Sequence, residues 1–421
     1  IQPNALASDQ QSPAKRPEPE LFSIQMVLNP KANTETLKKI EQLQLASPVK
    51  QGPSGNYYNI VAKLPPAQIA SLAEQPDIIS IGPYQTPGKR DEKQCIIMTG
   101  QLSGNVPTGP GYMDWLANRG FTQAQFDSSG LVVDVTDSPI DNGSTNANHF
   151  ALYKDGTITN SPSRVVYTRL EGTANTGSVT SAQDGHGNLN AHIIAGQVNL
   201  TNSPHTDASG YKYGIGVAPF VKVGGSIIFD ASTFTSPNYD NLAARAYRDG
   251  ARVSGNSWGA DTAGAYDADA QNYDRLVRDA QPSGSVVATA GNQQMTFVFA
   301  AGNAGSGTQT VGSPGTAKNV ITVGAAENVR AFGGSDGSGI ADTGADSAND
   351  IISFSSRGPC ADSRKKPDIM APGTHITGGA PQNVKTMSGT GTALTIFDGS
   401  GVSGGVGSNF FPSSGQQFYT A

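Results

Sequence analysis

Cysteine and long hydrophobic runs are scarce in this sequence. Only two cysteines occur among 421 residues, so at most one intramolecular disulfide can form and a disulfide-rich scaffold is excluded. No apolar run approaches the ~20 residues that a membrane-spanning helix requires. The formal net charge of −6 gives no basic footprint for nucleic acid or an anionic membrane. We therefore expect neither among the partners, and whether Cys95 and Cys360 pair stays open.

Glycine and proline, by contrast, are abundant. The 51 glycines and 26 prolines indicate many turns and long connections. Charged residues make up 15% of the chain and apolar residues 36%, which is typical of globular rather than disordered proteins. A chain of this length is expected to form about two or three domains.

The N-terminal part predicts a flexible lead-in followed by a small α+β domain. Residues 1–20 are polar and rich in proline. Residues 21–84 show the alternation of half-buried strands and two helical stretches, the first capped by Asn33 or Thr34. The expected elements are a strand at 22–28, a helix at 33–40, a weak strand at 48–51, a strand at 58–64, a helix at 65–72 and a strand at 77–81. This βαββαβ order is that of the ferredoxin-like split unit.

A polar segment at 85–94 is expected to link this domain to a larger one at 95–421. The Lys89-Arg90 pair in the linker would be an accessible cleavage point, and a solvated run of charges is the alternative interpretation. In the larger domain, apolar runs bounded by glycine alternate with helical stretches at 237–249 and 269–279. The runs are Leu131–Val135, Val165–Leu170, Val221–Phe229, Ser285–Ala290, Phe297–Ala301 and Asn319–Ala325. They predict an open, mostly parallel, doubly wound α/β sheet, in which sites form beyond the carboxyl ends of the strands.

Three polar residues near the ends of these elements are candidate site residues. Asp137 follows a predicted strand, His186 lies between two glycines before an apolar helical stretch, and Asn303 follows another strand. Each residue alone is also typical of an ordinary turn or loop. Asn292, which likewise follows Ala-Gly, remains an alternative to Asn303.

The order of these residues resembles that of the subtilisin family of serine proteases (subtilases), in which Asp, His, Asn and Ser follow one another along the chain. The resemblance covers about residues 115–390. Two further features carry it. Ser257-Trp258-Gly259 is similar to the family's substrate-binding edge, and residues 353–359 with 366–373 are similar to the stretch that precedes its nucleophile.

The resemblance implies a role for each candidate. His186 would be the general base, Asp137 would orient the imidazole and stabilise the imidazolium, and Asn303 would donate to the oxyanion. The backbone of residues 257–259 would pair with an extended peptide substrate. Residues 21–84 resemble the family's propeptide, which acts as an inhibitor and folding assistant. No cofactor is required, and calcium as a structural ion is allowed by the resemblance, although no acidic cluster has a ligand spacing that names its residues.

The sequence departs from the family pattern at the nucleophile. Residues 387–393 fit the serine motif with Gly391 in the position of the serine, and the stretch that follows is too rich in glycine and serine for a core helix. One interpretation is that 380–417 is an inserted loop and that the nucleophile lies beyond Ala421. The other is a glycine-substituted, inactive enzyme. A relocated nucleophile at Ser388 is the least favoured interpretation.

We therefore expect a secreted serine endopeptidase with an Asp-His-Ser triad, made as a zymogen that is covered by residues 21–84. Its partners would be peptide or protein substrates and its own prodomain. The alternative is a catalytically inactive member of the fold that serves as a binding or scaffold protein. A nucleotide-binding α/β protein is disfavoured, because no predicted strand is followed by a phosphate-cradling glycine-rich loop and helix.

Overall fold

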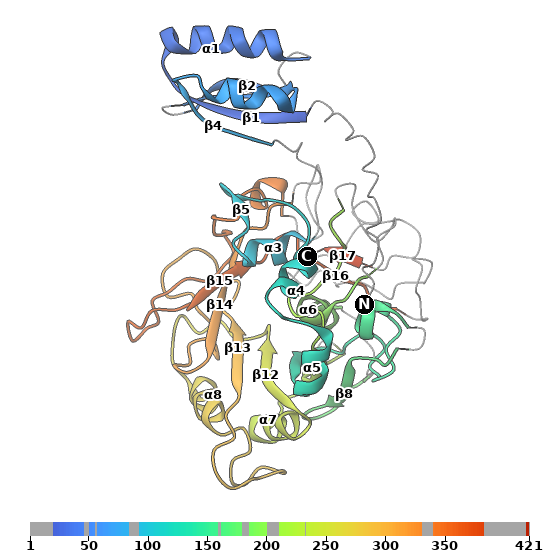
Figure 1. The fold of residues 1–421 in the computed structure, drawn as a ribbon. Helices are drawn as coiled ribbons and strands as arrows, with labels where there is room; N and C mark the ends of the chain where they lie inside the picture. Colours follow the sequence, from blue (N-terminus) through green and yellow to red (C-terminus); the bar gives the residue numbers. More distant parts are fainter. Residues whose placement is uncertain are drawn as a thin grey trace, which may run out of the picture. The chain divides into compact units, whose positions relative to one another are not determined.

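The protein divides into two compact units, Ile1–Gly88 and Lys89–Ala421, in a computed structural model (Figure 1). The structure describes residues 20–45, 50–54, 57–83, 92–158, 161–178, 185–199, 210–231, 233–330, 340–382 and 418–420. None of the helices in these ranges is long and apolar enough to cross a membrane. Each unit is described by itself.

The first unit is a four-stranded antiparallel sheet with two helices. Its elements are β1 (Glu20–Val27), α1 (Pro30–Leu43), β2 (Lys50–Ser54), β3 (Tyr57–Leu64), α2 (Ile69–Ala73) and β4 (Ile78–Pro83). The strand order β2-β3-β1-β4 confirms the predicted βαββαβ arrangement. Alternate residues of β1 and β3 form the core with residues of both helices: Phe22, Ile24, Met26, Ile40, Ile60, Ala62, Leu64 and Leu72.

Helix α1 begins earlier than the sequence predicts. The side chain of Asn29 accepts hydrogen bonds from the backbone amides of Lys31 (3.1 Å) and Ala32 (3.3 Å), so Asn29 caps the helix in place of Asn33 or Thr34. Pro30 occupies the first helical position, where its missing N–H costs nothing. Asn33 is instead buried and donates to Asp77 at 2.7 Å.

The second unit contains a seven-stranded parallel sheet, which confirms the predicted α/β class. Its strands are β7 (Val132–Asp137), β8 (Val165–Leu170), β9 (Lys222–Ile227), β12 (Ala251–Asn256), β13 (Thr296–Ala300), β14 (Ile321–Ala326) and β15 (Ile369–Pro372). The strand order is β15-β14-β13-β12-β7-β9-β8. The principal helices are α4 (Tyr112–Asn118), α5 (Gln123–Ser129), α6 (His186–Ala195), α7 (Tyr239–Arg248) and α8 (Ala268–Arg278).

Apolar clusters cover both faces of this sheet. One cluster joins the sheet to α7 and α8, and it includes Ala243, Ala246, Ala270, Tyr273, Leu276, Phe297 and Phe299. The other joins the opposite face to α6 through Ala191 and Ala195. Strand β7 contributes Val132 to the first cluster and Val133 and Val135 to the second, as alternation along a strand requires.

The strand order changes direction at β7, which lies between β9 and β12 although it precedes both in the sequence. Such a switch point leaves a crevice beyond the carboxyl ends of the strands, where ligands of open α/β sheets bind. Strand β7 ends at Asp137. The sheet therefore places Asp137 at the position where a site is expected.

Two predictions about the second unit differ from the structure, and one question that the sequence left open is answered. Ser285–Ala290 forms turns and bends rather than a strand, and Val286 is 57% exposed, so this apolar run is not part of the buried sheet. Residues 92–94, predicted as linker, are buried at the start of helix α3 (Lys93–Met98). The two cysteines are buried and free, so they form no disulfide with each other.

Candidate active site

Asp137 and His186 form the centre of the candidate site. Their side chains approach to 2.6 Å, between Oδ1 of the carboxylate and Nδ1 of the imidazole, although 49 residues separate them in the sequence. The carboxylate is 1% exposed and the imidazole 24%. Nδ1–H donates to the carboxylate, which leaves Nε2 as the ring nitrogen that can accept a proton from a substrate-side group. This is the geometry of a general base that is held by a buried acid.

The local sequence explains why the two side chains meet. His186 is the first residue of α6, which runs unbroken to Ala195 from an N-cap at Gly185, whose φ is +76°. The backbone N–H of Gly187 donates to Ser138 Oγ at 2.9 Å. A Cβ on Gly187 would lie 1.9 Å from the carbonyl oxygen of Ser138. Only glycine therefore allows the helix to start so close to the turn after β7.

Other aspartates and histidines nearby are turned into the core. Asp134 is fully buried and accepts hydrogen bonds from the hydroxyls of Thr136, Tyr167, Ser226 and Ser254. His192, on the same helix as His186, is also fully buried, and no hydrogen bond reaches either of its ring nitrogens from the described residues. Burial lowers the pKa of His192 well below its usual value, and the charges of His149 and Arg164 act in the same direction. His192 therefore stays neutral and inaccessible, and His186 is the histidine of this helix that a substrate can reach.

Arg164 fixes the far end of the same helix. Its buried guanidinium donates to the carbonyl oxygens of Tyr153 (3.1 Å), Val221 (2.7 Å), Ala151 (2.7 Å) and Ala195 (2.5 Å). Ala195 is the last residue of α6, so the guanidinium satisfies one of the helix's unpaired carbonyls and complements its dipole. Burial lowers the pKa of Arg164 to about 9.

Residues 257–259 directly follow β12 at the same edge of the sheet. Ser257 Oγ donates to Asn190 Oδ1 at 3.0 Å, and the indole of Trp258 packs edge-on against Phe299 in the core. Regular pairing resumes at Ala260, which exchanges backbone hydrogen bonds of 2.8 and 3.0 Å with Ser313. Residues 257–259 thus lie between the end of β12 and the bridge that joins Ala260 to Ser313, and they belong to neither.

The structure separates the two candidate asparagines. Asn303 is exposed and follows the carboxyl end of β13. Because β13 pairs in parallel with β12, Asn303 and residues 257–259 follow neighbouring strands at the same edge of the sheet. Asn292 precedes β13 and lies at the amino end. The turn that carries Asn303 is held from the segment 353–357: Ser356 N–H donates to Gly302 O (3.0 Å), and Ala304 N–H donates to Ser356 Oγ (3.1 Å).

The two sequence positions considered for the nucleophile are not among the residues that the structure describes. Gly391 and Ser388 both lie outside the described ranges. A short strand pair is nevertheless visible near α6, where β16 (Thr377–Gly379) pairs antiparallel with β17 (Phe418–Thr420). Gly379 O accepts a hydrogen bond from the side chain of Asn188, two residues after His186. The chain at β16 therefore touches the first turn of the helix that carries the candidate base.

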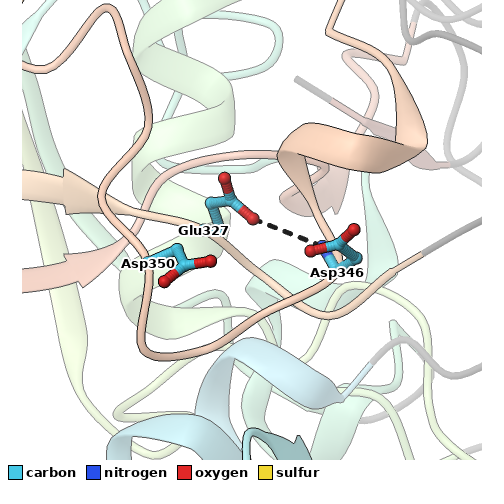
Figure 2. Close-up of side chains that lie close together, drawn as sticks. All are labelled: Glu327, Asp346 and Asp350. Atoms are coloured by element: carbon cyan, nitrogen blue, oxygen red, sulfur yellow. Dashed lines mark hydrogen bonds between the residues drawn. The ribbon is translucent and has the colours of Figure 1, made fainter.

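An acidic group that the sequence did not reveal lies after β14. One ligand oxygen from each of Glu327, Asp346 and Asp350 falls within 4.8 Å of the others (Figure 2). Glu327 is 7% exposed, and burial raises the pKa of its carboxyl, with the charges of Asp346 and Asp350 adding to the rise. The backbone N–H of Asp346 donates to Glu327 at 3.4 Å. Carboxylate oxygens at this separation can hold a hard cation such as calcium.

Comparison with known proteins gives a family match. The profile of the Subtilase family (Peptidase S8) matches residues 128–397, which is more than half of the chain. Serine protease AprX of Bacillus subtilis is 39% identical over 108 residues, which are 26% of this chain and 21% of AprX. Pyrolysin of Pyrococcus furiosus is 43% identical over 116 residues, covering 25% of this chain and 8% of pyrolysin. The chain thus matches only a small part of the length of either relative.

Among solved structures, the chain is similar to the epidermin leader peptide processing serine protease of Staphylococcus aureus. The alignment covers 85% of this chain and 76% of that protein at 16% identity, with a TM-score of 0.34.

Proposed function

The chain belongs to the Subtilase family, and from this premise we propose that it is a serine endopeptidase in which Asp137 and His186 activate a serine. The 2.6 Å contact between their side chains, at the switch point of the parallel sheet, is the observation that carries the proposal. A buried carboxylate beside a partly exposed imidazole suits proton transfer to and from a substrate.

His186 would take the proton of the attacking serine at Nε2 and return it to the leaving amine. Asp137 would keep the imidazole in the Nδ1–H tautomer and stabilise the imidazolium that forms at each transfer. The carboxylate is suited to this role because the backbone N–H of Ser138 also donates to Oδ1, at 2.7 Å, which keeps the oxygen aimed at the ring.

The remaining parts of the site would bind the peptide and the oxyanion. Residues 257–259 are left outside the β12 ladder, which supports pairing with an extended substrate strand. Asn303 is exposed at the adjacent strand end and would donate its amide to the developing oxyanion. Such a donor typically contributes about 2.7–4 kcal/mol to transition-state stabilisation.

We propose that the nucleophilic serine follows β17. The pairing of β17 with β16 supports this, because β16 contacts the first turns of α6, where His186 lies. A serine a few residues after this strand would be within reach of the imidazole. Residues 387–393 fit the serine motif only with glycine at position 391, so they would be part of the connection between the two strands.

We also propose that the first unit is a prodomain and that the enzyme is exported as a zymogen. The antiparallel βαββαβ sheet of this unit supports the comparison with a propeptide. Removal would occur in the segment 85–91, because the chain from Glu92 onward is part of the second unit's core. N-terminal sequencing of the protein from the culture medium of its host would locate the mature end, and a protein that is retained in the cells with Ile1–Gly88 attached would contradict this part.

Calcium is the ion that we propose for the acidic group after β14. The three carboxylates provide oxygen ligands on two loops, and a backbone carbonyl or water can complete the six to eight ligands that calcium takes. The ion would tie the loop at 346–350 to the end of β14. Its contribution would be structural.

Peptide hydrolysis by the complete gene product tests the proposal. The parent protein is incubated with a mixed peptide library, and products are read by mass spectrometry. We expect internal cleavage, and losses in kcat of about 10⁴-fold for Asp137→Asn and about 10⁶-fold for His186→Ala. Asp261→Asn, a change at an exposed loop residue, is the control. A folded parent that cuts no peptide and keeps a peptide-binding edge would instead support the inactive scaffold.

A further inference from the structure

We propose that Asn190 is a positioning residue that joins the acid of the catalytic pair to the substrate-binding edge, an inference that rests on the proposed peptidase function. Its side-chain amide makes hydrogen bonds in both directions. Nδ2 donates to Asp137 Oδ2 at 3.1 Å, and Oδ1 accepts from Ser257 Oγ at 3.0 Å. One side chain therefore contacts both the carboxylate and residues 257–259.

The helix places Asn190 for this role. Asn190 lies four residues after His186, so both side chains project from the same face of α6. Nδ2 also donates to the carbonyl oxygen of His186 at 3.1 Å and lies 3.4 Å from Nδ1 of its ring. These contacts fix which way the amide points, because the carboxylate and the carbonyl both require the NH₂ group and Ser257 requires the oxygen.

Asn190 differs in this respect from Asn188, the other asparagine of the helix. Asn188 is fully buried, and its hydrogen-bond partners within the described part of the chain are backbone groups, the N–H of Asp141 (3.0 Å) and the carbonyl of Gly379. That arrangement is structural. Asn190 is partly exposed and, besides the carbonyl of His186, it bonds to the side chains of Asp137 and Ser257.

Two consequences follow for the chemistry. The Nδ2–H donor holds the second oxygen of Asp137, so the carboxylate cannot rotate away from the imidazole between proton transfers. The same N–H group also offsets part of the negative charge of the Asp137 carboxylate, which stabilises the imidazolium of His186. In addition, the positive end of the amide dipole faces the ring, so both effects disfavour the imidazolium. A change that removes the donor should therefore raise the pKa of His186, and a change that puts a carboxylate there should raise it further.

The bond to Ser257 extends this arrangement to the substrate. Ser257 is the first residue after β12, where an added peptide strand would begin to pair. Through Asn190, the position of that strand is fixed relative to Asp137. Asn190 thus sets the distance between the bound peptide and the base, and an error of about 1 Å in such a distance can cost about 10²-fold in rate.

The first test is an NMR titration of His186 in the 421-residue chain, which needs no nucleophile. The variants are Asn190→Ala, which loses donor and acceptor; Asn190→Asp, which keeps an acceptor and loses the donor; and Ser257→Ala. We expect the pKa of His186 to rise in the order parent, Asn190→Ala, Asn190→Asp, and to stay at the parent value in Ser257→Ala. Asn118→Asp makes the same chemical change on the exposed end of α4 and is the control. Folded Asn190→Ala and Asn190→Asp proteins that titrate like the parent would overturn the inference.

The second test uses the kinetics of the complete gene product. Asn190→Ala and Asn190→Asp are expected to lower kcat by about 10–100-fold, and the acid limb of the kcat/KM profile should move to higher pH in Asn190→Asp. Ser257→Ala should act mainly on KM. An unchanged kcat and pH profile in both Asn190 variants would contradict the role. If the unsubstituted protein hydrolyses no peptide, the result contradicts the peptidase function instead. The order of the His186 pKa values in the NMR titration then still decides whether Asn190 controls the pair of Asp137 and His186.

Discussion

The hydroxyl of Ser138 accepts a hydrogen bond from the backbone amide of Gly187 at 2.9 Å, and this contact brings the end of β7 against the start of α6. Asp137 precedes the first of these residues and His186 precedes the second. The contact therefore helps to hold the side chains of the candidate pair, Asp137 and His186, within reach of one another.

Gly187→Ala should disrupt this arrangement. The new Cβ would lie 1.9 Å from the carbonyl oxygen of Ser138, so the helix start must move away from the strand end. We expect a stability loss of about 1–3 kcal/mol by urea unfolding and a fall in peptidase activity of about 10²-fold. Gly109→Ala is the matched control, because a Cβ there meets nothing within 4 Å. Equal activities of the two variants would show that the helix start does not control the pair.

Arg164→Met should destabilise the second unit strongly. The substitution removes the donor that Arg164 supplies to the carbonyl oxygens of Ala195 and Val221. The oxygens of Ala151 and Tyr153 also lose Arg164 but keep backbone N–H donors in Gln197 and Gly156. Buried groups left without partners cost about 1–3 kcal/mol each before relaxation, so we expect a total loss of about 3–5 kcal/mol. Arg275→Met removes an exposed ion pair with Asp240 and should cost less than about 1 kcal/mol. Similar unfolding midpoints for both variants would contradict the proposed role of Arg164.

Stability should fall as the pH drops below the ordinary pKa of histidine, and His192 should be one cause. Burial holds the pKa of His192 well below 6.5 in the folded protein, so the unfolded chain binds the proton more readily. The contribution of His192 is complete above pH 6.5 and is lost below it, by at most about 1.4 kcal/mol per pH unit. Urea unfolding of His192→Leu between about pH 5 and 8 should give a flatter dependence than the parent. A parallel dependence would mean that His192 does not contribute.

Calcium should raise the melting temperature, and the rise should depend on the acidic group after β14. At a concentration 100-fold above the dissociation constant, the ion would add about 2.7 kcal/mol. Asp350→Asn removes one of the three carboxylates and should reduce the effect, whereas Asp261→Asn should not. Calorimetry of both variants, with calcium and with a chelator, measures the change in melting temperature. A melting temperature that does not change with calcium, or that changes equally in both variants, would exclude an ion at this group.

Much of the fold was readable from the sequence because hydrophobic periodicity reports burial directly. Buried parallel strands gave continuous apolar runs at β7, β8, β9, β13 and β14, and the alternating residues of β1 and β3 identified the small sheet. The run Ser285–Ala290 was predicted as a strand by the same criterion. It fails because this run lies at the surface, where Val286 is 57% exposed, and the apolar pattern of so short a run does not reveal that.

The site was less readable, because side chains from different elements meet only in the folded chain. Asp137 and His186 stood out through a strand end and flanking glycines, whereas Asn190 was missed, although its four-residue spacing from His186 on a predicted helix was an available signal. The acidic group had no such signal. Glu327 meets Asp346 and Asp350 through the course of a loop, and no periodic pattern encodes that course.

Covalent labelling of the complete gene product by a fluorophosphonate, followed by mass spectrometry of the modified peptide, addresses the central claim most directly. Our account requires one labelled serine that follows β17, and it requires His186→Ala to abolish the label because the imidazole is the base that activates that serine. A label on Ser388, or one that persists at full rate without His186, would show that this pair does not activate the nucleophile.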